Sequence, residues 1–219
     1  MGQGKSTNGA KMGLIVATTD DFRPSLIPLW ESTWDKLKEK HPLLKVTVFV
    51  APFNQEFGVN EEDNISNSQA FKEWFIERID WVIIELHGFD HTKPPENIRS
   101  EDEQERIVKS SIFALRDYID VDYIGYKAPF FQANSTMTTV LARCGIKWYD
   151  QWYHLNFVEP NKKPIPPHLV IPTHTNMEVA QNPDQIDKIY DELDKKLTEL
   201  EDMGWKYSTY RQIMWEVLN

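Results

Sequence analysis

Residues that could bind a metal ion stand in two short groups along this sequence. Asp20 and Asp21 follow an apolar run, and His87 and His91 have three residues between them. Adjacent aspartates at a strand end often only form a turn, and such histidine pairs also occur on solvated loops. Histidines at this spacing can nevertheless share one face of a helical turn and both reach a metal. Because a carboxylate with two imidazoles is a common ligand set for catalytic zinc, the combination predicts a metal site.

Three further polar residues, Lys127, Asp150 and His174, also stand where predicted strands end. Each would, singly, be an ordinary surface or core residue. Parallel strands present their carboxyl ends at one edge, where α/β folds gather their chemistry, so we expect all these side chains at the same end of the fold. The other histidines lack such a context and are expected to have no role in chemistry: His41, His154 and His168.

The elements that would position these residues alternate between short apolar runs and longer segments of helical period. This pattern is typical of strands connected by covering helices. The expected strands are 14–18, 46–51, 81–86, 123–127, 146–149, 169–172 and 205–207. We expect helices over 25–40, after a capping box formed by Ser100 and Glu103, and after Asn134 and Asn182. Segments 52–67 and 160–167 are expected to be loops.

Composition narrows the class of protein. The 219 residues, 41% of them hydrophobic, are enough for one domain, expected over 12–219 with a flexible tail over 1–11. A net charge of -10 makes nucleic acid an unfavourable partner. No apolar run is long enough to span a bilayer, so we expect no membrane partner. A single cysteine, Cys144, excludes an intrachain disulfide, and the cytoplasm is the expected location.

The polar groups, taken in order, resemble the motifs of the polysaccharide deacetylase or NodB-homology superfamily, the family 4 carbohydrate esterases. Thr18 to Asp21 resembles the first motif and His87 to His91 the second. Lys127 to Phe130 resembles the third, and Pro172 to His174 the last. The resemblance implies an α/β fold, a distorted (β/α) barrel of about seven mainly parallel strands.

The resemblance also implies a function and a role for each site residue. An enzyme of this kind hydrolyses the acetyl group of an N-acetylated sugar or polysaccharide with one divalent ion, Zn²⁺ or alternatively Co²⁺, Ni²⁺ or Mn²⁺. The implied ligands are Asp21, His87 and His91, with Asp20 as general base and His174 as general acid. The remaining implied roles are orientation of Asp20 by Lys127, orientation of His174 by Asp150, an oxyanion contact from the Phe130 N–H, and a sugar site lined by Pro129 and Trp152.

Four positions depart from the pattern of the family. Thr19 replaces an aromatic residue, Gly88 replaces a Ser or Thr, and Asp150-Gln151-Trp152 only approximates the fourth motif. Lys127 replaces an arginine, and a lysine cannot grip a carboxylate with two prongs. An isolated lysine at this place would more often point into solvent. Three alternatives therefore stay open: a hydrolase of cyclic imides or other amides on the same fold, a carbohydrate-binding relative without activity, and a structural role.

Overall fold

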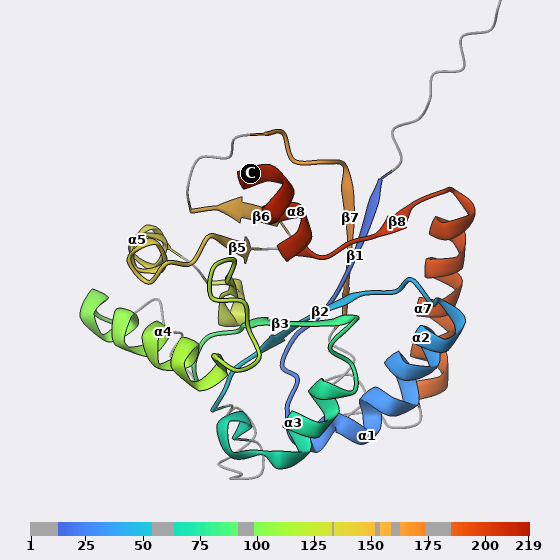
Figure 1. Ribbon diagram of the computed structural model, residues 1–219, viewed down its shortest axis with the longest axis horizontal. Helices are drawn as coiled ribbons and strands as arrows, with labels where there is room; N and C mark the ends of the chain where they lie inside the picture. Colours follow the sequence, from blue (N-terminus) through green and yellow to red (C-terminus); the bar gives the residue numbers. More distant parts are fainter. Residues whose placement is uncertain are drawn as a thin grey trace, which may run out of the picture.

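The computed structural model describes residues 13–53, 64–91, 99–132, 134–151, 154–158, 163–173 and 185–219. Its strands are β1 (Leu14–Thr19), β2 (Val46–Val50), β3 (Val82–Leu86), β4 (Gly125–Lys127), β5 (Trp148–Gln151), β6 (His154–Phe157), β7 (His168–Thr173) and β8 (Lys206–Tyr207) (Figure 1). The seven strands predicted from the sequence are all present, with ends shifted by one or two residues. Strand β6 was not predicted, because its alternation is short and only Leu155 is buried.

The strands form one curled sheet in the order β6-β5-β4-β3-β2-β1-β7. Strand β8 pairs with the first residues of β1, and all pairings are parallel except that of β5 with β6. This curled half-barrel agrees with the distorted (β/α) barrel expected from the motifs. The parallel register brings the carboxyl ends of β1, β3, β4 and β5 to one edge of the sheet, as Lys127 opposite Asp150 illustrates.

Helices cover the outer face of the sheet, and one helix lies inside its curl. They are α1 (Ile27–Trp30), α2 (Lys36–Lys40), α3 (Gln69–Ile76), α4 (Glu101–Leu115), α5 (Ser135–Arg143), α7 (Ile186–Asp202) and α8 (Tyr210–Leu218). Figure 1 shows α8 on the side of β5, β6 and β7, away from α1 to α4. Tyr210 and Met214 of α8 pack with Val16, Phe49 and Trp148, which point inward from the strands. The sheet is therefore packed on both faces.

Local sequence explains several helix ends. Ser100 accepts a hydrogen bond from the Glu103 N–H at the start of α4, and Asn134 accepts one from the Met137 N–H at the start of α5, as predicted. The single helix expected over 25–40 is instead α1 and α2 joined by a π-helical segment, Glu31–Asp35. The sequence did not predict α3 or α8, and Asn182 lies outside the described residues.

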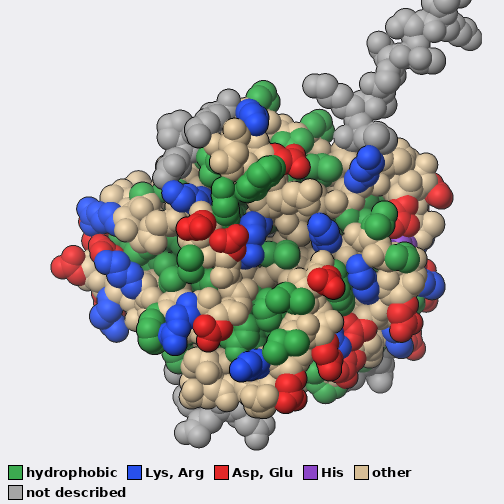
Figure 2. Space-filling view, in the orientation of Figure 1, with side chains coloured by type: hydrophobic (Ala, Val, Ile, Leu, Met, Phe, Trp, Pro, Cys, Tyr) green, Lys and Arg blue, Asp and Glu red, His purple; other side chains and the backbone are tan. Residues whose placement is uncertain are grey.

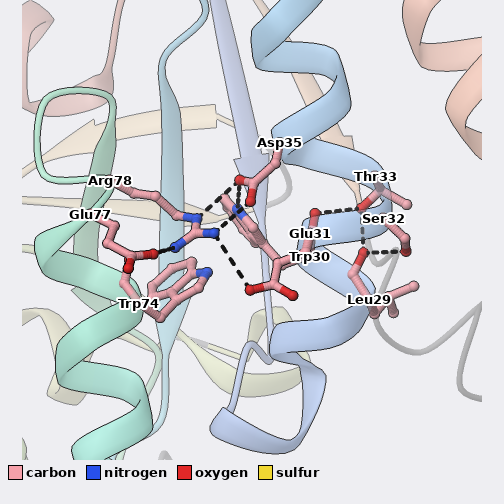
Figure 3. Close-up of polar contacts among 9 residues, drawn as sticks. All are labelled: Leu29, Trp30, Glu31, Ser32, Thr33, Asp35, Trp74, Glu77 and Arg78. Atoms are coloured by element: carbon pink, nitrogen blue, oxygen red, sulfur yellow. Dashed lines mark hydrogen bonds and ion pairs between the residues drawn. The ribbon is translucent and has the colours of Figure 1, made fainter.

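An ionic cluster on the outer face joins α3 to the π-helical segment (Figure 3). Arg78 Nε lies 3.0 Å from Asp35 Oδ1, and Arg78 Nη2 lies 2.5 Å from Asp35 Oδ2. Arg78 Nη1 also donates to the carbonyl of Trp74 and to Glu77. The indole N–H of Trp30 donates to Asp35 Oδ1 at 3.1 Å. We call these residues the Arg78 cluster, in which each nitrogen of the guanidinium has an acceptor.

A second ionic contact fixes α8 to the inner face of the sheet. Arg211 Nε donates to Glu85 Oε1 at 2.9 Å, and Glu85 Oε2 accepts the Gly125 N–H at 2.8 Å. Burial raises the pKa of Glu85, and the Arg211 charge offsets only part of that rise. A Cβ at Gly125 would lie 2.0 Å from the Trp148 ring, so glycine is required at this contact.

The surface mixes charges of both signs. Figure 2 shows Lys and Arg side chains interspersed with Asp and Glu over one face, with no continuous basic patch on it. Among the described residues, no helix is long and apolar enough to cross a bilayer.

Candidate active site

The polar residues predicted from the sequence meet at the carboxyl edge of the sheet. Asp20 and Asp21 follow β1, His87 follows β3, Lys127 ends β4 and Asp150 lies in β5. All of them are buried, as is His91. Buried charged groups are stable only when paired or bound to a metal, so their contacts define what the site can do.

The carboxylate of Asp21 lies between the two histidines. Its Oδ1 is 3.1 Å from Nε2 of His87 and 3.1 Å from Nε2 of His91. The Nδ1 of His87 lies 3.0 Å from the carbonyl oxygen of Lys127, which only accepts, so this nitrogen carries the proton. The Nε2 atom of His87 then faces Asp21 and is the atom that could bind a metal. Donor atoms of the three residues all lie within 4.8 Å of one another, which fits a single divalent cation.

Burial and the neighbouring charges shift the two imidazoles in opposite directions. Burial lowers the pKa of His87, but the Asp21 carboxylate together with that of Asp20 outweighs burial, and the pKa is raised. Burial and the His87 charge lower the pKa of His91 to about 4. His91 is therefore neutral at physiological pH, as a metal ligand must be.

The backbone at this site adopts conformations that side chains rarely allow. Among the described residues, the non-glycine residues with positive φ are Asp21 (60°), His91 (54°), Phe130 (56°) and Phe131 (55°). Each lies in or next to the predicted site. Such angles are costly for residues with a Cβ and persist only where the surrounding structure imposes them.

The sequence left open whether the two histidines lie on a helical turn or on a loop, and the structure places them on a loop. No helix spans His87 to His91, and the backbone has positive φ at Gly88 (73°) and at His91 (54°). Glycine adopts this angle without steric cost. The replacement of Ser or Thr by Gly88 thus suits the backbone of this loop.

Lys127 is fully buried and does not point into solvent. Its Nζ lies 2.9 Å from Asp20 Oδ1 and 2.7 Å from Asp20 Oδ2, and 3.3 Å from Asp150 Oδ2. The rings of Phe49 and Phe131 lie on the ammonium at 5.1 and 5.0 Å. Burial lowers the pKa of Lys127, but Asp20 and Asp150 outweigh it and the pKa is raised. Lys127 is therefore a cation held against the expected base.

Of the remaining predicted site residues, the structure describes Pro129 and Phe130 but not Trp152 or His174. Pro129 is buried, and the Phe130 ring lies 4.6 Å from the ring of His91. Strand β7 ends at Thr173, whose carbonyl accepts the Asp20 N–H at 3.3 Å. His174 and Trp152 lie outside the described residues, so their roles stay predictions.

Sequence reasoning missed Phe49 and Phe131, the two rings around the ammonium of Lys127. Phe49 could have been assigned from strand alternation, since it shares the inward face of β2 with Thr47. Phe131 carries no such signal, because its position depends on the positive φ of Phe130 and of Phe131 itself.

Solved structures similar to this chain include family 4 carbohydrate esterases. An acetyl xylan esterase from Clostridium thermocellum in complex with a cobalt ion is 14% identical, with a TM-score of 0.55 over 93% of this chain and 91% of that chain. The Xyl-CE4 domain of a multidomain xylanase from the hindgut metagenome of Trinervitermes trinervoides is 13% identical, with a TM-score of 0.53 over 94% and 91%. A family 4 pseudoenzyme from Bacillus anthracis is 11% identical, with a TM-score of 0.52 over 93% of this chain and 66% of that chain.

These likenesses establish the fold of the protein. It is the fold of the family 4 carbohydrate esterases, as the motif resemblance predicted. The chain spans about two thirds of the length of the Bacillus anthracis pseudoenzyme (66%). No protein-family model and no curated protein sequence matches the chain.

Proposed function

We propose that this protein is a metal-dependent deacetylase that hydrolyses the acetyl group of an N-acetylated sugar or polysaccharide. One observation carries the proposal: a compact Asp21, His87 and His91 cluster lies beside the buried ion pair of Asp20 and Lys127. The ligand set and a separate carboxylate base are the two parts that amide hydrolysis at a metal requires. The fold shared with carbohydrate esterases supports the same reading.

The cation would be held by Asp21 Oδ and by Nε2 of His87 and His91. Two imidazoles and one carboxylate favour Zn²⁺, and Co²⁺, Ni²⁺ or Mn²⁺ also suit these ligands. When bound, such a cation polarises the acetyl carbonyl and makes water acidic enough to be deprotonated at neutral pH. The hydrogen bond from His87 Nδ1 to the Lys127 carbonyl would hold the ring in its ligating orientation.

Asp20 would accept the proton of the attacking water. Lys127 lies against both carboxylate oxygens of Asp20, so it fixes the direction of the carboxylate. An arginine would grip Asp20 with two parallel hydrogen bonds. Here the Phe49 and Phe131 rings confine the single ammonium instead, which restores part of that orientation.

The carbonyl oxygen gains negative charge as water attacks, and the Phe130 N–H would donate to it. The positive φ of Phe130 sets the direction of this N–H. His174 would protonate the departing amine nitrogen, with Asp150 orienting it. Pro129 and Trp152 would line the sugar site. The products are acetate and a free amine.

A second candidate is a carbohydrate-binding protein without activity. The pseudoenzyme from Bacillus anthracis shares this fold, and Lys127 replaces the arginine of the family. Such a protein would bind acetylated sugar and release no acetate.

Acetate release from a panel of N- and O-acetylated sugars tests the proposal. The protein is assayed after chelation and after adding back Zn²⁺, Co²⁺, Ni²⁺ or Mn²⁺ singly. We expect the wild type to release acetate from an N-acetylated sugar only when metal is present, and His87→Ala to release none. The control is His168→Gln, at the amino end of β7 and so at the opposite edge of the sheet from the candidate site. It should release acetate normally. Sugar binding without acetate release under every metal would favour the second candidate.

A further inference from the structure

A groove of about 720 Å³ opens along α4, beside the loop of residues 87–91, which we call the metal loop. We call it the α4 groove. It is lined by Phe53 and Phe89, by Ser66 and Asn67, and by one face of α4 with the turn after it. The groove meets the candidate active site at Phe89, which stands between His87 and His91 in sequence. The Phe89 carbonyl accepts the Phe53 N–H at 3.0 Å, and the two rings lie 4.7 Å apart. An occupant of the groove would therefore touch the loop that carries both histidines.

The charge of the groove is opposite to that of the chain. Three cations, Arg106, Lys109 and Arg116, line it with a single carboxylate, Asp117, whereas the whole chain carries -10. Lys109 is engaged by Glu105 at 2.6 Å, and Arg116 lies 3.8 Å from Asp117. The Arg116 guanidinium also lies 4.0 Å from the centre of the Phe113 ring, but most of the Phe113 side chain stays exposed. The exposed guanidinium of Arg106 makes no hydrogen bond or ion pair with any residue in the described parts of the chain. Arg106 is thus available to a ligand anion.

The groove also offers an aromatic surface. Phe113 is 68% exposed on the same face of α4 as Arg106, two turns further along the helix. A ring this exposed costs free energy in water unless something covers it. The apolar C–H face of a sugar ring would cover Phe113 while a carboxylate on the same sugar chain reached Arg106.

We propose that the α4 groove binds an N-acetylated oligosaccharide that carries carboxylate groups, and presents its acetamide to the metal loop. This inference rests on the proposed function, which identifies the reacting group as an acetamide. The acidic character of the substrate is inferred from the cations of the groove. The proposal assigns the substrate class as acidic glycans in preference to neutral ones.

Binding is measured by calorimetry, separately from acetate release, with two matched probes. One is a tetrasaccharide that alternates glucuronic acid with N-acetylglucosamine, and the other is a neutral tetramer of N-acetylglucosamine. We expect the acidic probe to bind at least about fivefold more tightly at low salt, with the preference falling as salt is raised.

Three variants test whether the preference for the acidic probe comes from the α4 groove. Arg106→Gln should remove most of the difference between probes, and Phe113→Ala should weaken both probes alike. Lys188→Gln removes the same charge from α7, where the side chain is 72% exposed, and should leave both affinities unchanged. Equal affinities, no binding of either probe, or an unchanged preference in Arg106→Gln would overturn the proposal. Acidic preference without acetate release would support the groove and contradict only the proposed deacetylase.

Discussion

Two buried cations in this protein are held by carboxylates in different ways. In the Arg78 cluster, the guanidinium reaches Asp35 with two nitrogens and the Trp74 carbonyl with a third (Figure 3). Lys127 instead presents one nitrogen to both oxygens of Asp20 and, at 3.3 Å, to Asp150. In the Arg78 cluster each guanidinium nitrogen has its own acceptor. At Lys127 two carboxylates share a single ammonium.

The two cations also differ in the backbone angles and the hydrogen bonding of the residues around them. Asp35 lies in backbone of ordinary helical angles. Lys127 is followed three residues later by Phe130 at φ of 56° and contacts Phe131 at 55°. The buried Oδ1 of Asp150 accepts no hydrogen bond in the described part of the chain. Backbone strain and the incompletely satisfied Asp150 carboxylate distinguish the surroundings of Lys127 from those of Arg78, which joins two helical segments.

The largest effect is expected at Asp20. Asp20→Asn keeps the shape of the side chain but cannot accept a proton, so kcat should fall by roughly 10²–10⁴-fold. The measurement is kcat for acetate release with the preferred metal. The matched variant in the other cluster is Asp35→Asn, for which kcat of the folded protein should not change. Full activity in Asp20→Asn would remove this residue as the base.

Removing each cation should separate stability from activity. Lys127→Ala and Arg78→Ala each leave carboxylates without a counter-charge and should each lower the free energy of unfolding by about 3 kcal/mol. Urea denaturation measures this. Only Lys127→Ala should also lower kcat of the folded protein, whereas Lys127→Arg should retain activity. An unchanged kcat in Lys127→Ala would mean that both cations are merely structural.

The metal-free protein should lose stability in acid through His91. Its pKa is lowered from 6.5 to about 4, so the unfolded chain binds this proton first as the pH falls. The stabilisation is complete above pH 6.5 and is lost as the pH falls toward 4, by up to about 3 kcal/mol. Denaturation of the chelated protein across this range should show the slope, and His91→Gln should reduce it. Equal slopes in both proteins would contradict neutral burial of His91.

The smallest effect is expected in the metal loop. Gly88→Ala places a Cβ at φ of 73° and should cost about 1 kcal/mol of stability. It should also weaken metal binding, because His87 and His91 depend on this turn. Metal titration of the variant checks the second effect. An unchanged metal affinity would show that the loop tolerates another backbone conformation.

The strands and the site differ in how far sequence could predict them. Apolar runs located seven strands, and Ser100 and Asn134 marked two helix starts, because these signals are local. Strand β6 escaped because its pattern is short. The contact of Lys127 with Asp20 joins residues 107 apart in sequence, and no local pattern encodes it. The motif order indicated that these residues belong together, but the confinement of Lys127 by Phe49 and Phe131 required the structure.

The central claim is that Asp21 is a metal ligand whereas its neighbour Asp20 is not. Elemental analysis of the purified wild type, Asp20→Asn and Asp21→Asn after dialysis against Zn²⁺ tests it most directly. We predict one zinc per chain in the wild type and in Asp20→Asn, and a large loss of zinc in Asp21→Asn. Equal zinc in all three proteins, or loss of zinc in Asp20→Asn alone, would contradict the account.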